Sequence, residues 1–272
     1  MENPWLRAEK ERNERLRCTD MSESLSADRV TELLEAMRQS PLEHRQAMSL
    51  LVKHMPKRDL RAVDKTLLLE NVRYSYLARE ETPWGPHLPD ELFFNYVLPY
   101  ANLTEARDHW RRNLYPRCRE IVQPCRTPGE AAVRLNEHIF DQLNVTYHAT
   151  KRPWPDQSPS ESIRAGYASC TGLAILLVDA CRSVCVPARI VGVPRWNSPE
   201  PTNNHTWVEI WDGQWHFLEP ARPGPFDQAW FLSAATKAQA DCWETSIYAA
   251  SFLPAETWFV MVWALGIQDV PA

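Results

Sequence analysis

The chain has 272 residues, 44% of them hydrophobic, and a formal net charge of −5, which is typical of a globular protein with a sizeable core. The acidic balance offers no basic surface to a polyanion, and no apolar run approaches the roughly 18 residues of a membrane-spanning helix, so neither nucleic acid nor a membrane is expected as a partner. The N-terminal segment is charged where a signal peptide would be apolar, which favours a cytoplasmic location, or an exported one if a targeting segment has been removed.

The first half of the chain is predicted to be helical. Apolar residues recur at helical spacing from about Ala27 to Gln39. A capping box at Ser40-Pro41-Leu42-Glu43 predicts that a second helix begins there and runs to about His54. Further helices are expected over about residues 65–80, 90–96, 104–121 and, behind a second capping box at Thr127, to about residue 143.

After Asn144 the pattern changes to short strands and proline-rich loops. The segment 170–185 is apolar on nearly every face, which predicts a helix buried on all sides. Strands are expected over 144–150, 188–193, 245–252 and 257–264, and another helix over 225–240. The predicted fold class is therefore α+β, with a mainly helical region over residues 1–126 and an α+β core over residues 127–272 in which the buried helix packs against an antiparallel sheet.

The stretch NHTWVEIWDGQWHFLEP, residues 204–220, is predicted to form a β-hairpin. A three-residue loop, Trp211-Asp212-Gly213, with glycine in the left-handed position, would pair Ile210 with Gln214. His205 then lies directly opposite Glu219 on the same face of the sheet. An imidazole facing a carboxylate is either a structural ion pair or the orienting half of a catalytic triad.

Cys170 opens the predicted buried helix. The unpaired N–H groups and positive dipole at a helix N-terminus stabilise a thiolate, and they can also donate to an oxyanion formed one bond away. The alternative is that Cys170 is a small buried hydrophobic residue, which is the role expected of Cys181 and Cys185. The seven cysteines include no CxxC pair, and neither HExxH nor a glycine-rich phosphate loop occurs, so no metal or cofactor site is predicted.

Four segments, GYASCTGLAILL, VPARIVG, NHTWVEIW and WHFLEP, resemble the transglutaminase-like superfamily, whose fold is similar to that of papain-type cysteine proteases. The resemblance covers about residues 130–220, and the preceding helical region is similar to that of a group of bacterial transglutaminase-like proteins. The family's acid is commonly aspartate, whereas here it is Glu219. A glutamate can still orient an imidazole if the strand spacing absorbs one methylene.

The resemblance implies that Cys170 is the nucleophile, His205 the general base and then acid, and Glu219 the group that fixes the histidine tautomer. Such a triad acts on an amide of a protein or peptide substrate through a thioester, which is hydrolysed or transferred to an amine, and it needs no cofactor. Trp154 and Gln157 are candidates for the second oxyanion donor, and Trp154 is equally a packing residue. Trp207 is a candidate for the cleft wall, although cross-strand packing explains it as well.

Two alternatives to an enzyme remain open on the sequence. The first is a protein-interaction module that keeps the fold without catalysis, with the N-terminal helices covering the cleft or exposed tryptophans binding a partner. The second is a core cysteine with an unrelated histidine–glutamate pair, which requires the order and spacing of the three residues to be coincidental. The three candidates in family order favour the enzyme.

Overall fold

The computed structural model describes residues 25–199 and 203–272, which form an α+β fold, as predicted. Its helices are α2 (Ala27–Gln39), α3 (Arg45–His54), α4 (Lys57–Ala62), α5 (Lys65–Glu81), α6 (Asp90–Tyr96), α7 (Trp110–Val122), α8 (Pro128–Leu143), α9 (Pro159–Ala165), α10 (Cys170–Ser183) and α11 (Leu232–Ala235), with 3-10 turns η1 (Leu42–His44) and η2 (Gly85–His87). Its strands are β1 (Thr146–Tyr147), β2 (Tyr167–Ala168), β3 (Ala188–Val193), β4 (His205–Trp211), β5 (Trp215–Leu218) and β6 (Tyr248–Ala249).

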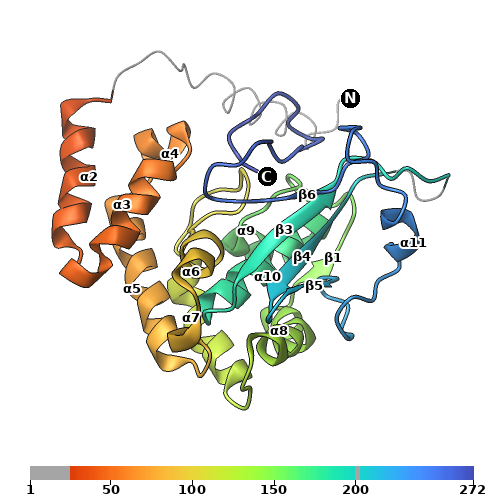
Figure 1. Cartoon of the computed structure of the whole chain (residues 1–272), viewed down its shortest axis with the longest axis horizontal. Coiled ribbons are helices and arrows are strands. Elements are labelled where there is room, and N and C mark those ends of the chain that lie inside the picture. Colours follow the sequence, from red (N-terminus) through yellow and green to blue (C-terminus); the bar gives the residue numbers. More distant parts are fainter. Residues whose placement is uncertain (1–24, 200–202) are drawn as a thin grey trace.

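A four-stranded antiparallel sheet in the order β5-β4-β3-β6 lies beside helices α2–α7, and α10 packs against β3 and β4 (Figure 1). Successive side chains of β4 point to opposite faces of the sheet, so they belong to two different hydrophobic clusters. Val208 and Ile210 join the main core, which also contains α10. Trp207 joins a smaller aromatic cluster with Trp196 and Phe231. The sheet therefore separates the buried helix from an aromatic layer.

The helix α10 is buried on all sides, as its sequence predicts. Every residue from Thr171 to Ser183 is buried. Two of these residues are ionisable, and each has buried polar contacts: Asp179 accepts a hydrogen bond from Asn102 at 2.8 Å, and Arg182 donates to the carbonyl of Ala101 at 3.1 Å. Because buried polar groups need such partners, these contacts fix α10 relative to the segment around residue 102.

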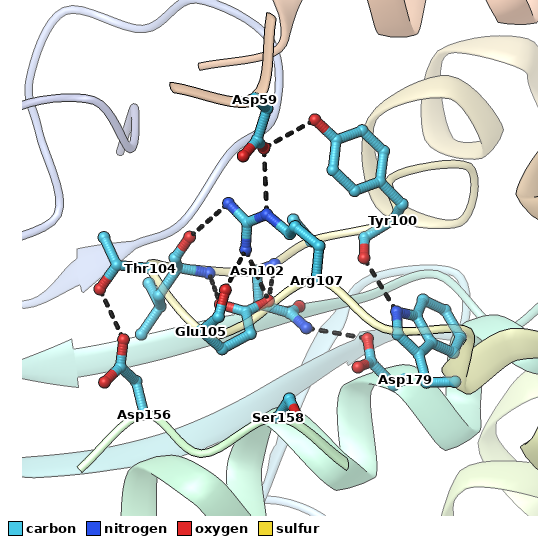
Figure 2. A network of polar contacts seen from close by, with 12 residues as sticks. Asp59, Tyr100, Asn102, Thr104, Glu105, Arg107, Asp156, Ser158 and Asp179 are labelled. Carbon is cyan, nitrogen blue, oxygen red and sulfur yellow. Dashed lines mark hydrogen bonds and ion pairs between the residues drawn. The ribbon is translucent and has the colours of Figure 1, made fainter. Parts of the chain in front are cut away.

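A polar network in the segment 100–107 connects the helical region to the core (Figure 2). Asp59 accepts hydrogen bonds from the Tyr100 hydroxyl at 2.7 Å and from Arg107 at 3.0 Å. Thr104 donates from its hydroxyl to Asp156 at 2.5 Å, which fastens the loop that precedes α9. Buried charge-assisted hydrogen bonds are strong and directional, so the network holds that loop in one position. The chain continues from this loop through α9 and β2 to the start of α10.

Two helix starts differ from the sequence expectation. Ser40 does not cap a second helix, because its hydroxyl donates to the carbonyl of Ala36 at 3.0 Å and so closes the end of α2. The next α-helix begins at Arg45 after a 3-10 turn. The helix expected from residue 104 begins only at Trp110, since the residues before it belong to the network described above. At α8 the predicted start is confirmed, with the Thr127 side chain accepting from the Glu130 N–H at 3.1 Å. The Glu130 carboxylate accepts from the Arg126 N–H at 2.7 Å, so the second bond of the predicted capping box does not form.

The C-terminal part departs most from the prediction. The helix expected over 225–240 is reduced to the four residues of α11. Asp227 has a positive φ of 61° and its carboxylate accepts from the Phe217 N–H at 3.0 Å, so the chain turns back onto β5 instead of starting a helix. The strand expected over 257–264 is irregular apart from a bridge between Trp258 and Pro271. Only Tyr248–Ala249 of the expected 245–252 strand joins the sheet, and β1 is likewise limited to two residues.

None of the helices within residues 25–199 and 203–272 combines the length and apolar character needed to cross a membrane. The division of the chain into two domains at residue 126 stays a prediction. Apolar side chains from the helical region and from the α+β core form one contiguous hydrophobic cluster, which contains both Leu68 of α5 and Leu176 of α10.

Candidate active site

Cys170 lies at the first position of α10, where its side chain is partly exposed. Ser169 caps the helix: its hydroxyl accepts from the Gly172 N–H at 3.4 Å and donates to the Pro155 carbonyl at 2.7 Å. The N-terminus of α10 is thus tied to the loop that the polar network fixes. A thiol placed here faces the positive end of the helix dipole.

The hairpin forms, but its register differs from the prediction by two residues. Trp211 pairs with Trp215 and Val208 with Leu218, so the loop is Asp212-Gly213-Gln214 and Gly213 takes the positive φ of 80°. A shift of two preserves the face of every side chain. His205 and Glu219 therefore still share a face, although diagonally and not directly opposite.

The hairpin loop is held by α8. Asp212 accepts a hydrogen bond from the Thr127 hydroxyl at 3.2 Å. A Cβ on Gly129 would lie 2.3 Å from the Asp212 carboxylate, so this close approach requires glycine at position 129. These contacts between distant parts of the chain fix the loop at Asp212 and thereby the register.

His205 and Glu219 contact each other as predicted. The distance from His205 Nε2 to Glu219 Oε2 is 2.9 Å, and both side chains are about nine-tenths buried, with 8% and 11% exposure. The other carboxylate oxygen of Glu219 accepts from the Trp230 indole N–H at 3.3 Å. The extra methylene of glutamate is accommodated because Glu219 lies one residue beyond the end of β5, where the backbone turns away from the sheet.

A residue that the sequence analysis missed, Asn136 of α8, holds this turn. Its side-chain amide donates to the carbonyls of Glu219 at 3.0 Å and Arg222 at 3.2 Å, and its oxygen accepts from the Ala221 N–H at 2.9 Å. Ala221 has a φ of 58°, a conformation that costs free energy unless neighbouring contacts impose it. Asn136 is 2% exposed, and no local motif distinguishes it from a core residue of an amphipathic helix.

Replacing Asn136 with alanine is expected to lower the free energy of unfolding by about 1–3 kcal/mol, because buried backbone groups of the turn lose their partners. It is also expected to slow the alkylation of Cys170 at neutral pH severalfold, since Glu219 is no longer held against His205. Chemical denaturation and timed iodoacetamide labelling measure the two effects. Labelling at the wild-type rate in the folded variant would show that Asn136 supports the fold alone.

The electrostatics of the site favour an ion pair between Cys170 and His205. Burial raises the pKa of Cys170, but a hydrogen bond to His205 and the charge of its ring outweigh burial and bring the pKa below its ordinary value. Burial lowers the pKa of His205, whereas hydrogen bonds to Cys170 and Glu219 and the charges of both raise it to about 9. Each ion stabilises the other, so the thiolate and imidazolium forms occur together.

Aromatic rings surround His205. The centroid of its ring lies 4.9 Å from that of Trp230, 5.1 Å from Phe231, 6.1 Å from Trp207 and 6.3 Å from Trp196. These rings restrict the imidazole to one orientation and exclude water from the ion pair, which strengthens its attraction. Trp230 and Phe231 come from the segment that was predicted to be helical.

The three triad candidates line a single cavity of about 380 Å³. The cavity lies at the N-terminus of α10, and its lining comes from the loops around β1, β4 and β5 and from the C-terminal segment. Besides Cys170, His205 and Glu219, the lining includes Tyr147, Arg152, Ser169, Thr171, Arg222, Trp230, Val262 and Trp263.

The remaining predicted site residues lie outside this lining. The Trp154 indole N–H donates to Glu161 at 3.0 Å. Gln157 is fully buried and its side-chain amide donates to the Tyr167 carbonyl at 3.2 Å. Trp207 is 3% exposed within the aromatic cluster. None of the three side chains lines the cavity, and each is engaged by packing or by a neighbouring acceptor. The roles of Trp154 or Gln157 as oxyanion donor and of Trp207 as cleft wall stay predictions.

The other buried cysteines have the electrostatics of core thiols. Burial raises the pKa of Cys118 and Cys185 to about 12 and that of Cys181 further. Such thiols are protonated at neutral pH and poorly nucleophilic. Among the residues that the structure describes, no group of three or more histidine, cysteine or acidic side chains is arranged to hold a metal ion.

Comparison with known proteins finds one family match and a distant structural similarity. Residues 116–220 match the family model described as Transglutaminase-like superfamily. No curated protein sequence matches the chain significantly. Among solved structures, the chain is similar to a candidate cysteine protease from Cytophaga hutchinsonii, with 19% identity and a TM-score of 0.36 over 52% of this chain, and it spans only about half (48%) of that protein. The matched residues 116–220 contain Cys170, His205 and Glu219, so the segment that carries the three candidates is the one similar to the transglutaminase-like superfamily.

Proposed function

We propose that this protein is a thiol enzyme that acts on amide bonds of a protein or peptide through Cys170, His205 and Glu219. The observation that carries the proposal is the convergence of the three side chains in one cavity, with the thiol at a helix N-terminus and the imidazole held by a carboxylate at 2.9 Å. The similarity of residues 116–220 to the transglutaminase-like superfamily supports the coarser statement that the function is of the cysteine-enzyme type.

In the proposed mechanism the Cys170 thiolate attacks the carbonyl carbon of the amide, and the carbonyl oxygen becomes an oxyanion beside the backbone N–H of Cys170. The His205 imidazolium gives its proton to the departing amine as the C–N bond breaks, which leaves a thioester. Water or a second amine then attacks the thioester while His205 accepts a proton, and the thiolate departs. Glu219 keeps the imidazole in place and stabilises its charged form.

The triad does not separate hydrolysis from acyl transfer, because the outcome depends on whether water or an amine reaches the thioester. We favour hydrolysis because water needs no dedicated acceptor site. A glutamine-containing peptide incubated with hydroxylamine would reveal acyl transfer as a hydroxamate, and mass spectrometry of the same peptide without hydroxylamine would reveal hydrolysis.

The experiment that tests the proposal is mild iodoacetamide labelling at neutral pH, with intact-mass analysis and mapping of the modified cysteine. We expect Cys170 to react at least tenfold faster than the buried thiols, because a thiolate paired with an imidazolium is the reactive form. The His205→Ala variant is expected to lose most of this selectivity, since the partner that lowers the pKa of Cys170 is gone.

Slow labelling of several thiols at similar rates would contradict the proposal. That result would favour the alternative in which the fold serves as an interaction module without catalysis. Circular dichroism of the His205→Ala variant serves as the control for folding.

A further inference from the structure

Two arginines line the cavity beside Cys170 without an acidic partner. Arg152 comes from the loop between β1 and α9, and Arg222 from the turn after β5. Two other arginines of this half of the chain have an acidic partner, Arg189 with Glu209 and Arg195 with Glu244. Among the described residues neither Arg152 nor Arg222 has a carboxylate within 4.0 Å, and the Nε of Arg152 is buried without a hydrogen-bond acceptor.

The charge of the cavity is opposite to that of the chain. The chain carries a net charge of −5, yet the single carboxylate among the described lining residues is that of Glu219. Both of its oxygens are occupied, one by His205 at 2.9 Å and the other by Trp230 at 3.3 Å. The guanidinium groups are therefore the charges left to interact with a bound molecule.

Tyr147 adds a hydrogen-bond donor to the lining of the same cavity. Burial raises the pKa of its phenol and the charge of Cys170 raises it further, whereas the charges of Arg152 and Arg222 act in the opposite direction. Tyr147, Cys170 and both arginines line this one cavity. Its neutral hydroxyl can donate to an anion that the arginines attract.

We infer that Arg152 and Arg222, with the Tyr147 hydroxyl, form a subsite for a carboxylate that the acyl donor carries close to its reacting carbonyl. Arginine is suited to this role because its planar fork of N–H donors matches the two carboxylate oxygens. The inference rests on the proposed role of Cys170 as nucleophile. It names the substrate class as acyl donors with a carboxylate beside the reacting amide, either an acidic side chain or a free C-terminus.

The test compares the alkylation of Cys170 by iodoacetate and by iodoacetamide. Both reagents form a carbon–sulfur bond with the thiolate and release iodide, so they differ only in the charge beside the reacting carbon. We expect Arg152→Gln and Arg222→Gln each to lower the iodoacetate rate roughly threefold to tenfold, because each removes a cation near the incoming carboxylate. The iodoacetamide rate is expected to change less than about twofold, since that reagent is neutral.

The matched control is Arg119→Gln, which removes the same charge from an exposed position on α7, where Arg119 pairs with Glu81. It is expected to leave both rates unchanged. The His205 imidazolium also attracts iodoacetate, but its contribution is common to all these variants and cancels in the comparison. Added salt should lower the iodoacetate rate of the wild-type protein more than the iodoacetamide rate, a measurement that requires no variant.

The source of the carboxylate is distinguished with longer probes of the same chemistry. Iodoacetylglycine against its amide represents a C-terminal carboxylate, and iodoacetylglutamic acid α-amide against the glutamine analogue represents an acidic side chain. For each probe pair we compare the rate of the charged probe with that of the neutral one. The pair for which this ratio falls when the arginines are replaced identifies the source of the carboxylate. Ratios that are insensitive to both arginine substitutions for every probe pair would overturn the subsite. If iodoacetamide did not label Cys170 selectively in the wild-type protein, the proposed function would be overturned instead.

Discussion

The Cys170→Ala variant is expected to lose at least about a thousandfold of the amide-cleaving or hydroxamate-forming rate, because the atom that attacks the carbonyl is removed and triad members act as a unit. The fold should persist, with a change in the free energy of unfolding within about 1 kcal/mol, since the substitution removes one partly exposed sulfur at the edge of the core. The rate is measured as hydroxamate formed from a glutamine peptide and as peptide cleavage, and stability by chemical denaturation.

The chain provides a matched control in Cys242, the other partly exposed cysteine among the described residues. A hydrogen bond to Thr245 lowers the pKa of Cys242, as the contact with His205 lowers that of Cys170, but Cys242 does not line the cavity. Cys242→Ala should retain the full rate. Residual activity in Cys170→Ala close to that of the wild-type protein would exclude the thiol mechanism, whatever the behaviour of Cys242.

Those parts of the site that depend on local patterns could be predicted from the sequence. The helix beginning at Cys170 follows from a segment that is apolar on nearly every face, and β3 from β-branched residues between a proline and a loop. The contact between His205 and Glu219 follows from alternation about the Asp212-Gly213 turn, because alternation fixes the face of each side chain. Alternation does not distinguish between registers that differ by two residues, because such a shift leaves every side chain on the same face. The contacts of Asp212 with Thr127 and Gly129 set that register, and they join positions more than 80 residues apart.

The parts that depend on packing between distant segments could not be predicted. Asn136 holds the turn after Glu219, but in the sequence it is one polar residue on an amphipathic helix. Trp230 and Phe231 enclose His205 from a segment whose composition favours a helix, and the fixed turn at Asp227 overrides that preference. Arg152 belongs to a proline-punctuated loop whose path is decided by the hydrogen bond between Thr104 and Asp156.

This dependence on distant segments gives the helical region a role in the site. Residues 100–107 hold the loop before α9, and the Pro155 carbonyl in that loop accepts the Ser169 hydroxyl that caps α10. The position of Cys170 is thus connected by hydrogen bonds to Arg107 and Asp59 in the helical region. A catalytic thiol must be held within a fraction of an ångström of its base, and a buried charge-assisted network provides such rigidity.

The Glu219→Gln variant separates the charge of the triad acid from its hydrogen bond. A glutamine can still accept from His205 Nε2, but it no longer raises the pKa of His205, which is expected to fall below its present value of about 9. The weaker imidazolium stabilises the thiolate less, so the pKa of Cys170 rises. Alkylation by iodoacetamide at pH 7 should therefore slow by roughly tenfold or more, and its midpoint should move to higher pH.

Turnover requires the thiolate and the imidazolium together, so its pH profile should narrow from both sides in Glu219→Gln. The alkaline limb, which reflects loss of the His205 proton, moves to lower pH, and the acid limb, which reflects formation of the Cys170 thiolate, moves to higher pH. Glu209→Gln is the matched control, because Glu209 lies on β4, the strand of His205, but binds Arg189 at 2.6 Å and does not line the cavity. Its profile should coincide with that of the wild-type protein. If the acid and alkaline limbs of the Glu219→Gln profile stayed at their wild-type pH, the carboxylate would orient the imidazole without raising its pKa. The ion pair would then depend on Cys170 and His205 alone.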